Sequence, residues 1–136
     1  MIYLDSAAVV KLCRAEAGTA ELVTWLTEQG DRAAVSSVLV AVEVPRALRR
    51  HSPTALAAAP TQIGRLYQHE LDATVRATAA AYPDPTLRSL DAIHLATAQV
   101  LADSTGEALT FVTYDRRLLA AAAATGLQTA SPGQQV

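Results

Sequence analysis

The sequence predicts an α/β fold with three layers, in which a short parallel sheet is flanked by helices on both faces. Short apolar segments that fit strands alternate with longer segments that fit helices along the whole 136-residue chain. Hydrophobic residues make up 51% of the chain but aromatic residues only 4%, and much of the apolar share is alanine, which favours helices. At this length, we expect residues 1–136 to form a single domain.

The N-terminal part predicts one strand and two helices. Ile2–Leu4 is a short apolar run that fits a buried strand. Ser6 follows as the expected N-cap of a helix over 7–14. Gly18 breaks the chain before Thr19–Glu28, an amphipathic helix. The apolar stripe of this second helix contains Leu22, Val23 and Leu26.

The middle of the chain is less regular. Residues 33–36 fit a strand, and Ser37 is the expected cap of a helix that runs to about residue 50. The first half of that helix is apolar all round, which predicts burial, although its valines also fit a strand. Pro45 predicts a kink. A short helical piece or loop follows, and the stretch 62–71 is ambiguous, with an end that fits a strand.

The second half alternates helices and strands. Asp72 is the expected cap of a helix over Ala73–Ala81, and Ser89 of a leucine-rich helix over 90–102. A strand over 109–113, a helix over Arg116–Ala124 and a last strand over 127–130 then follow. From about Ser131 onwards, we expect a frayed tail.

Composition excludes several classes of protein. Cys13 is the single cysteine, so an intramolecular disulfide and a cysteine-based zinc site are excluded. Asp5 interrupts the apolar N-terminus before a secretory signal could form, and no apolar run is long enough for a bilayer. We therefore expect a cytoplasmic protein with no membrane partner. The net charge of −2 argues against a nucleic-acid binder unless another group supplies positive charge.

Four acidic residues stand at informative places. Asp5 and Asp115 follow two predicted strands, so both are expected at the carboxyl edge of the sheet. Glu43 and Asp91 interrupt otherwise apolar helices, where an unpartnered acid is rare. Each acid alone has a structural explanation, such as a cap or a helix-dipole contact. The four together point to an acidic site.

If these carboxylates converge, they need a cation. Two unit charges about 4 Å apart repel by about 4 kcal/mol at an effective dielectric of 20. An empty site could therefore not keep every carboxylate ionised near neutrality. A set of oxygen ligands favours Mg²⁺ or Mn²⁺ over zinc, and such an ion activates water and attracts phosphate.

Four motifs resemble one known family. The segment 87–98, LRSLDAIHLATA, closely resembles the signature of VapC-type PIN-domain toxins. The segments 2–6, 36–43 and 112–118 are similar to that family's first strand and acid, its second acid on a helix, and its last acid. The resemblance covers nearly the whole chain in the same order, and only residues 51–84 are unspecific.

The resemblance implies a PIN-like α/β/α fold and an acidic site of Asp5, Glu43, Asp91 and Asp115. Asp5 and Asp91 would be the principal metal ligands. Glu43 would bind the metal directly or through water, or help to deprotonate the attacking water. Asp115 could act through water alone. The expected cofactor is Mg²⁺, with Mn²⁺ as a substitute.

Supporting residues follow from their positions. Ser6 and Thr113 would orient carboxylates or waters, or serve as caps and turn formers. Arg88, three residues before Asp91, is the best candidate for an RNA contact, against the alternative that it belongs to a solvated face. His94, three residues after Asp91, fits a hydrogen-bonded structural histidine better than a general base.

The family implies hydrolysis of RNA in single-stranded regions, through attack of a metal-activated water that leaves 5′-phosphate and 3′-hydroxyl ends. Such a protein is the toxin of a type II toxin–antitoxin system, so an antitoxin protein and a homodimer are expected partners. The alternatives are a non-catalytic PIN-like module for RNA or protein binding, and a DNA or structure-specific nuclease. A phosphoaspartate receiver or a dehalogenase-like phosphatase also places an Asp after its first strand. The phosphatase needs a second acid where this chain has Ala7.

Overall fold

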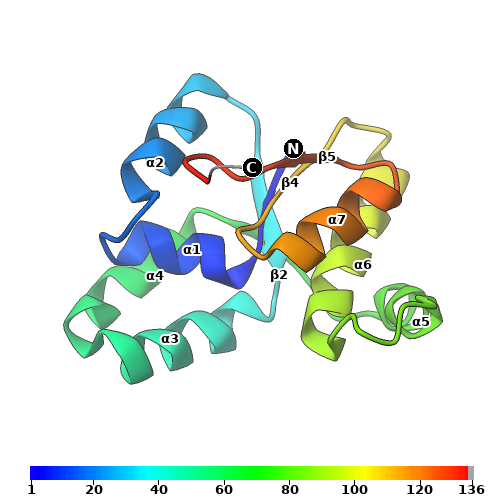
Figure 1. Cartoon of the computed structure of the whole chain (residues 1–136), viewed down its shortest axis with the longest axis horizontal. Helices are drawn as coiled ribbons and strands as arrows, with labels where there is room; N and C mark the ends of the chain where they lie inside the picture. Colours follow the sequence, from blue (N-terminus) through cyan, green and yellow to red (C-terminus); the bar gives the residue numbers. More distant parts are fainter. Residues whose placement is uncertain (135–136) are drawn as a thin grey trace.

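A computed structural model describes residues 1–134 and shows a twisted parallel sheet at the centre of the molecule (Figure 1). The strand order is β3-β2-β1-β4-β5, and every neighbouring pair is parallel. The strands are short: β1 (Ile2–Leu4), β2 (Ala34–Ser37), β3 (Tyr67–His69), β4 (Thr110–Val112) and β5 (Gln128–Ala130).

Helices cover both faces of the sheet, so the predicted three-layer α/β/α fold is confirmed (Figure 1). One face carries α1 (Ser6–Cys13), α2 (Thr19–Glu28), α3 (Val40–His51), the 3₁₀-helix η1 (Pro53–Ala58) and α4 (Ala59–Gly64). The other face carries α5 (Ala73–Ala81), α6 (Ser89–Thr105) and α7 (Arg116–Ala124). Within the described residues, no helix is long and apolar enough to cross a membrane.

The central strand β1 shows why its sequence is apolar at every position. Ile2 and Leu4 pack into a core under α1 to α4, whereas Tyr3 packs into a second core under α6 and α7. All three side chains are buried. A strand covered on both faces reads as a continuous apolar run rather than an alternating one.

The strand order creates a switch point beside β1. The chain runs from β1 outwards to β2 and β3, and then returns to place β4 on the other side of β1. In open parallel sheets the crevice for ligands lies outside the carboxyl ends of the strands at such a point. Asp5 follows β1 directly and Thr113 follows β4 directly, so the two residues stand on either side of this crevice.

Three predicted caps are wrong. Asp5 caps α1, because its carboxylate accepts a hydrogen bond from the Ala8 N–H at 2.9 Å, and Ser6 is the first helical residue. Ser37 ends β2 instead of capping α3, which begins at Val40. Arg88 stands at the cap position of α6, and Ser89 lies inside the helix.

The prediction that the start of α3 is buried on all sides is also wrong. Val40, Val44 and Leu48 are buried at a spacing of four residues, whereas Val42 is 63% exposed. Only one face of α3 therefore contacts the core, and the helix continues through Pro45. In α2, Val23 likewise leaves the predicted apolar stripe and is 48% exposed, while Leu22 is buried.

The segment after β5 does not fray where the sequence predicted it. The Ser131 hydroxyl donates to the Thr113 carbonyl, and the Tyr114 hydroxyl donates to the Pro132 carbonyl at 2.8 Å. The Gln134 side chain donates to the Tyr114 carbonyl at 3.2 Å. Hydrogen bonds to the loop after β4 therefore hold residues 131–134, and the last two positions of the predicted tail lie outside the described residues.

Candidate active site

The deepest acid of the candidate site is Asp5, which is 5% exposed. One carboxylate oxygen accepts the Ala8 N–H, and the other accepts the Thr113 hydroxyl at 2.5 Å. The same Thr113 oxygen accepts the backbone N–H of Asp115 at 3.2 Å. Thr113 therefore links the acid after β1 to the acid after β4 across the switch point.

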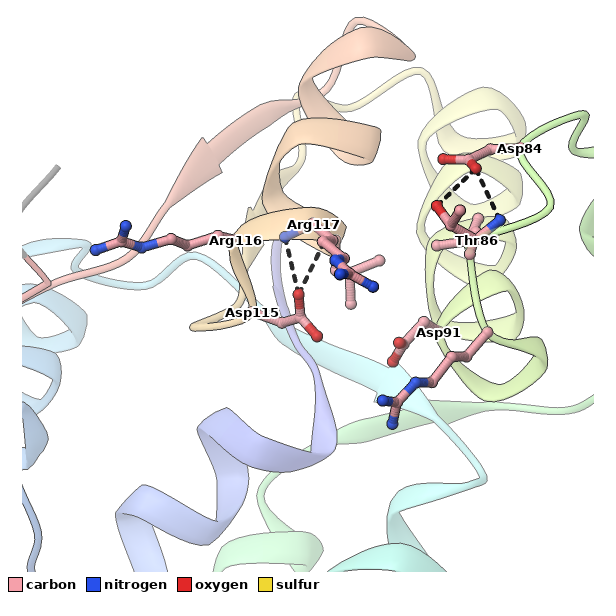
Figure 2. Close-up of a pocket in the computed structure, with 9 residues that line it drawn as sticks. Asp84, Thr86, Asp91, Asp115, Arg116 and Arg117 are labelled. Atoms are coloured by element: carbon pink, nitrogen blue, oxygen red, sulfur yellow. Dashed lines mark hydrogen bonds between the residues drawn. The ribbon is translucent and has the colours of Figure 1, made fainter.

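Asp91 and Asp115 line a pocket of about 400 Å³ beside Asp5. Asp91 lies in the first turn of α6, and Asp115 caps α7 by accepting the N–H groups of Arg117 and Leu118 at 2.9 and 3.2 Å. Figure 2 shows both carboxylates pointing into the space between the two helices. The cap holds Asp115 in place through one oxygen, Oδ1.

Arginines also border this pocket. Arg88, Arg116 and Arg117 are among its lining residues. In Figure 2 the Arg116 side chain extends away from the two carboxylates. Positive charge is thus available beside the acids despite the net charge of −2.

Glu43 lies on α3 and contacts residues of α1 and α6. Its Oε1 accepts the Ser6 hydroxyl at 2.7 Å and faces Nε2 of His94 at 2.8 Å. Ser6 and Thr113 thus each contact one acid, as an orienting role requires.

Two further residues belong to this hydrogen-bond arrangement: His94 contacts Glu43, and Tyr3 contacts His94. His94 is 2% exposed, and its Nδ1 lies 2.7 Å from the hydroxyl of Tyr3. Its position three residues after Asp91 was the available signal. Nothing in the local pattern singled out Tyr3, which reads as an ordinary strand residue.

Burial and like charges act against ionisation of two acids. Burial raises the pKa of Asp5, and the charge of Asp91 adds to this, although Thr113, His94 and the Ala8 N–H oppose it. Burial also raises the pKa of Asp91, together with the charges of Asp115 and Glu43, against the opposing effects of His94 and Arg88. The four acids therefore interact, as a converged site requires.

Glu43 behaves differently. Burial opposes its ionisation, but the hydrogen bonds of His94 and Ser6 outweigh burial, and the pKa of Glu43 is lowered. At neutral pH this carboxylate is therefore ionised and able to accept a proton or bind a cation.

The site fits a hydrated divalent cation held by few carboxylates better than a closed metal cage. Within residues 1–134, no three His, Cys, Asp or Glu side chains lie close enough together to hold a metal ion by themselves. Mg²⁺ usually keeps several waters and binds through one or two carboxylates plus substrate phosphates. The carboxylates of Asp91 and Asp115 and the pocket that they line meet these requirements.

Comparison with known proteins places the chain in a family. The PIN domain model matches residues 2–124, which include all four acids. The chain is 49% identical to "Ribonuclease VapC35" and 42% identical to "Ribonuclease VapC47", both of Mycobacterium tuberculosis, over 98% of each chain. It is 38% identical to "Ribonuclease VapC46" of the same species, over 96% of this chain and 97% of that protein. The fold and the acids at the carboxyl edge of the sheet agree with this sequence similarity. The chain belongs to the PIN-domain family and, within it, to the VapC group.

Proposed function

We propose that the chain is a metal-dependent endoribonuclease that hydrolyses RNA phosphodiester bonds, as the toxin component of a type II toxin–antitoxin system. The observation that carries the proposal is the placement of Asp5 after β1 and of Asp115 after β4, both bonded to Thr113, with Asp91 and Asp115 lining one pocket. Its VapC relatives, which are named ribonucleases, support the same reaction.

Asp5 and Asp91 would be the principal ligands of Mg²⁺, with Mn²⁺ as a substitute. Glu43 and Asp115 would complete the site directly or through water. When bound, such an ion supplies an activated water and neutralises charge that develops on the phosphoryl group. The raised pKa values of Asp5 and Asp91 support this assignment, because a bound cation stabilises the charged carboxylates that burial and, to a smaller extent, the neighbouring acids disfavour.

The chain's own residues have separable roles in this proposal. Thr113 and the Ala8 N–H orient the Asp5 carboxylate, and Ser6 orients Glu43. Glu43 stays ionised at neutral pH because its pKa is lowered, so it would bind the metal directly or through water, although the same shift makes it a weaker base for the attacking water. Arg88 lies at the pocket and would contact an RNA phosphate there.

The proposed partners follow from the proposed role. A toxin of this kind needs an antitoxin protein, which we expect to cover the acidic site, and we expect the toxin to form a homodimer. Cellular RNA as the substrate implies that the protein works in the cytoplasm.

Cleavage of a single-stranded RNA by the parent protein and by Asp5→Asn, with Mg²⁺ and with chelator, tests the proposal. We expect cleavage by the parent in Mg²⁺ alone, and none by Asp5→Asn. Asp103→Asn makes the same chemical change at an exposed position of α6 outside the pocket and should cleave like the parent. Cleavage of DNA in preference to RNA, or metal-free binding of RNA without cleavage, would replace the proposal with one of the alternatives.

A further inference from the structure

A chain of hydrogen bonds runs from the core of the protein to the edge of the acidic site. Tyr3 OH lies 2.7 Å from Nδ1 of His94, and Nε2 of His94 lies 2.8 Å from Oε1 of Glu43. The Ser6 hydroxyl donates to the same Oε1 at 2.7 Å and lies 3.2 Å from Nε2. Exposure rises along this chain, because Tyr3 and His94 are buried while the Glu43 side chain is 25% exposed.

The chemistry of the partners determines where the protons lie. A carboxylate can only accept, so the hydrogen between Oε1 of Glu43 and Nε2 must be carried by His94. In the neutral ring Nδ1 is then the acceptor of the Tyr3 hydroxyl, and in the imidazolium Nδ1–H donates to that hydroxyl; Nε2 carries a proton in both forms. The other neutral tautomer would place a bare nitrogen 2.8 Å from a carboxylate oxygen with no proton between them.

The imidazole cannot easily rotate out of this arrangement. It meets the Tyr3 ring edge-on, with centroids 5.8 Å apart and an interplanar angle of 79°. Tyr3 is itself stacked on Phe111 of β4, at 5.0 Å and 6°. The hydroxyl that pairs with Nδ1 of His94 is therefore anchored by the packing of β1 against its neighbour β4.

We infer that His94 is a positioning residue for Glu43. Its Nε2–H and the Ser6 hydroxyl both hold Oε1, and among residues 1–134 no donor bonds to the other oxygen, Oε2, which is left for the metal or its water. This inference rests on the proposed function, because Glu43 needs a fixed direction only if it acts on a metal or a water. The inference differs from the structural role that the sequence favoured for His94. A purely structural histidine needs only to fill its space in the core and to have hydrogen-bond partners for both ring nitrogens.

The tautomer can be measured directly by ¹⁵N NMR of the histidine rings in the metal-free parent protein at neutral pH. We expect a proton on Nε2 of His94, and a shift of the Nδ1 resonance in Tyr3→Phe. Tyr3→Phe retains the ring and deletes only the hydroxyl. An Nε2 without a proton in the parent would overturn the inference, whatever the activity of the protein.

Kinetics of RNA cleavage then test the effect on Glu43. Loss of a hydrogen bond that orients a metal ligand typically lowers activity about 10- to 100-fold, so we expect His94→Leu to lower kcat by that factor. We expect the KM for RNA to stay nearly unchanged. His94→Gln retains an N–H donor and should recover part of the loss, and Tyr3→Phe should lower kcat by less than His94→Leu.

A destabilised control separates positioning from stability. Leu101→Val creates a small cavity in the same helix, about two turns beyond His94, and should lower the Tm without lowering kcat at a temperature where all variants are folded. Parent-like kcat in His94→Leu, or equal losses in His94→Leu and His94→Gln, would reject the positioning role. A parent protein that cleaves no RNA with Mg²⁺ or Mn²⁺ would instead reject the proposed function, and the tautomer would still decide the hydrogen-bond arrangement.

Discussion

Asp5 makes two hydrogen bonds that stabilise the fold, but its negative charge is unfavourable at this buried position. Its carboxylate caps α1 and accepts the Thr113 hydroxyl, and both contacts favour the folded state. Burial nevertheless raises its pKa, as does the charge of Asp91. An ionised Asp5 therefore costs stability at neutral pH, which is expected where a site is built for a ligand that is absent.

Asp5→Asn is expected to make the metal-free protein more stable at neutral pH. The amide oxygen can still accept the Ala8 N–H, and the amide nitrogen can donate to Thr113, while the buried charge disappears. Substitutions that relieve such a site commonly add about 1 kcal/mol. Thermal unfolding in chelator would show this as a rise in Tm of roughly 3 to 5 °C.

Asp31→Asn, at an exposed turn position before β2, controls for the loss of a negative charge in general. It should leave the Tm within about 1 °C of the parent, because surface substitutions rarely change stability by more than about 0.5 kcal/mol. A lower Tm in Asp5→Asn would mean that the two hydrogen bonds of Asp5 need its charge.

Three helices that begin directly after a glycine or a capping aspartate were predicted correctly. Gly18 and Asp72 determine the starts of α2 and α5, and Asp115 that of α7, and all three helices have the predicted bounds. The start of α3 was not predictable in this way. Its valines suit a strand and a helix equally, and only the packing of Val40 and Val44 against the core decides.

The candidate site was also predictable only where a local sequence signal or a rule of sheet topology applies. The positions of Asp5 and Asp115 at one edge follow from the rule that the carboxyl ends of parallel strands share an edge. The contact of His94 with Glu43 depends on the relative rotation of α3 and α6. No local pattern encodes that rotation, so this contact and that of Tyr3 could not be predicted.

The start of α7 gives a prediction that separates capping from charge. Asp115→Asn should retain a side-chain acceptor for the N–H groups of Arg117 and Leu118, whereas Asp115→Ala should lose it. Loss of an N-cap acceptor costs about 1 kcal/mol. Chemical denaturation in chelator should therefore show Asp115→Ala to be the less stable of the two variants by about that amount.

Both Asp115 variants lack the carboxylate, so Mn²⁺ binding should weaken to a similar extent in each. Calorimetry with Mn²⁺ would measure this. If Asp115→Asn binds Mn²⁺ as tightly as the parent and only Asp115→Ala binds it more weakly, the loss reflects stability. Asp115 would then not belong to the proposed metal site.

For the whole molecule, the raised pKa values predict an unusual dependence of stability on pH. An acid whose pKa is raised by folding contributes stability below its unfolded pKa and loses it as the pH rises through the folded pKa. Asp5 and Asp91, whose ordinary pKa is 3.8, are both of this kind. Glu43 has a lowered pKa, and its contribution is lost only as the pH falls through that value.

In chelator, the free energy of unfolding should therefore fall as the pH rises above 3.8, the ordinary pKa of these two acids. Urea denaturation at a series of pH values from 4 to 7.5 measures this change. Mg²⁺ should restore stability at the higher pH, by about 2.7 kcal/mol at 100 times its Kd. The double variant Asp5→Asn, Asp91→Asn should show neither effect, and the same pH slope in this variant would assign the slope to other groups.

The position of β1 at the centre of the sheet has a consequence for synthesis on the ribosome. The strand emerges before β4 and Thr113, which lie over a hundred positions later; the hydrogen bond between Asp5 and Thr113 spans 108 positions. A nascent or truncated chain that ends before β4 holds Asp5, Glu43 and Asp91 but cannot close the sheet around them. The acidic site is therefore assembled only after β4 and Thr113 have been synthesised, so shorter nascent chains present no completed site to the RNA beside which they are made.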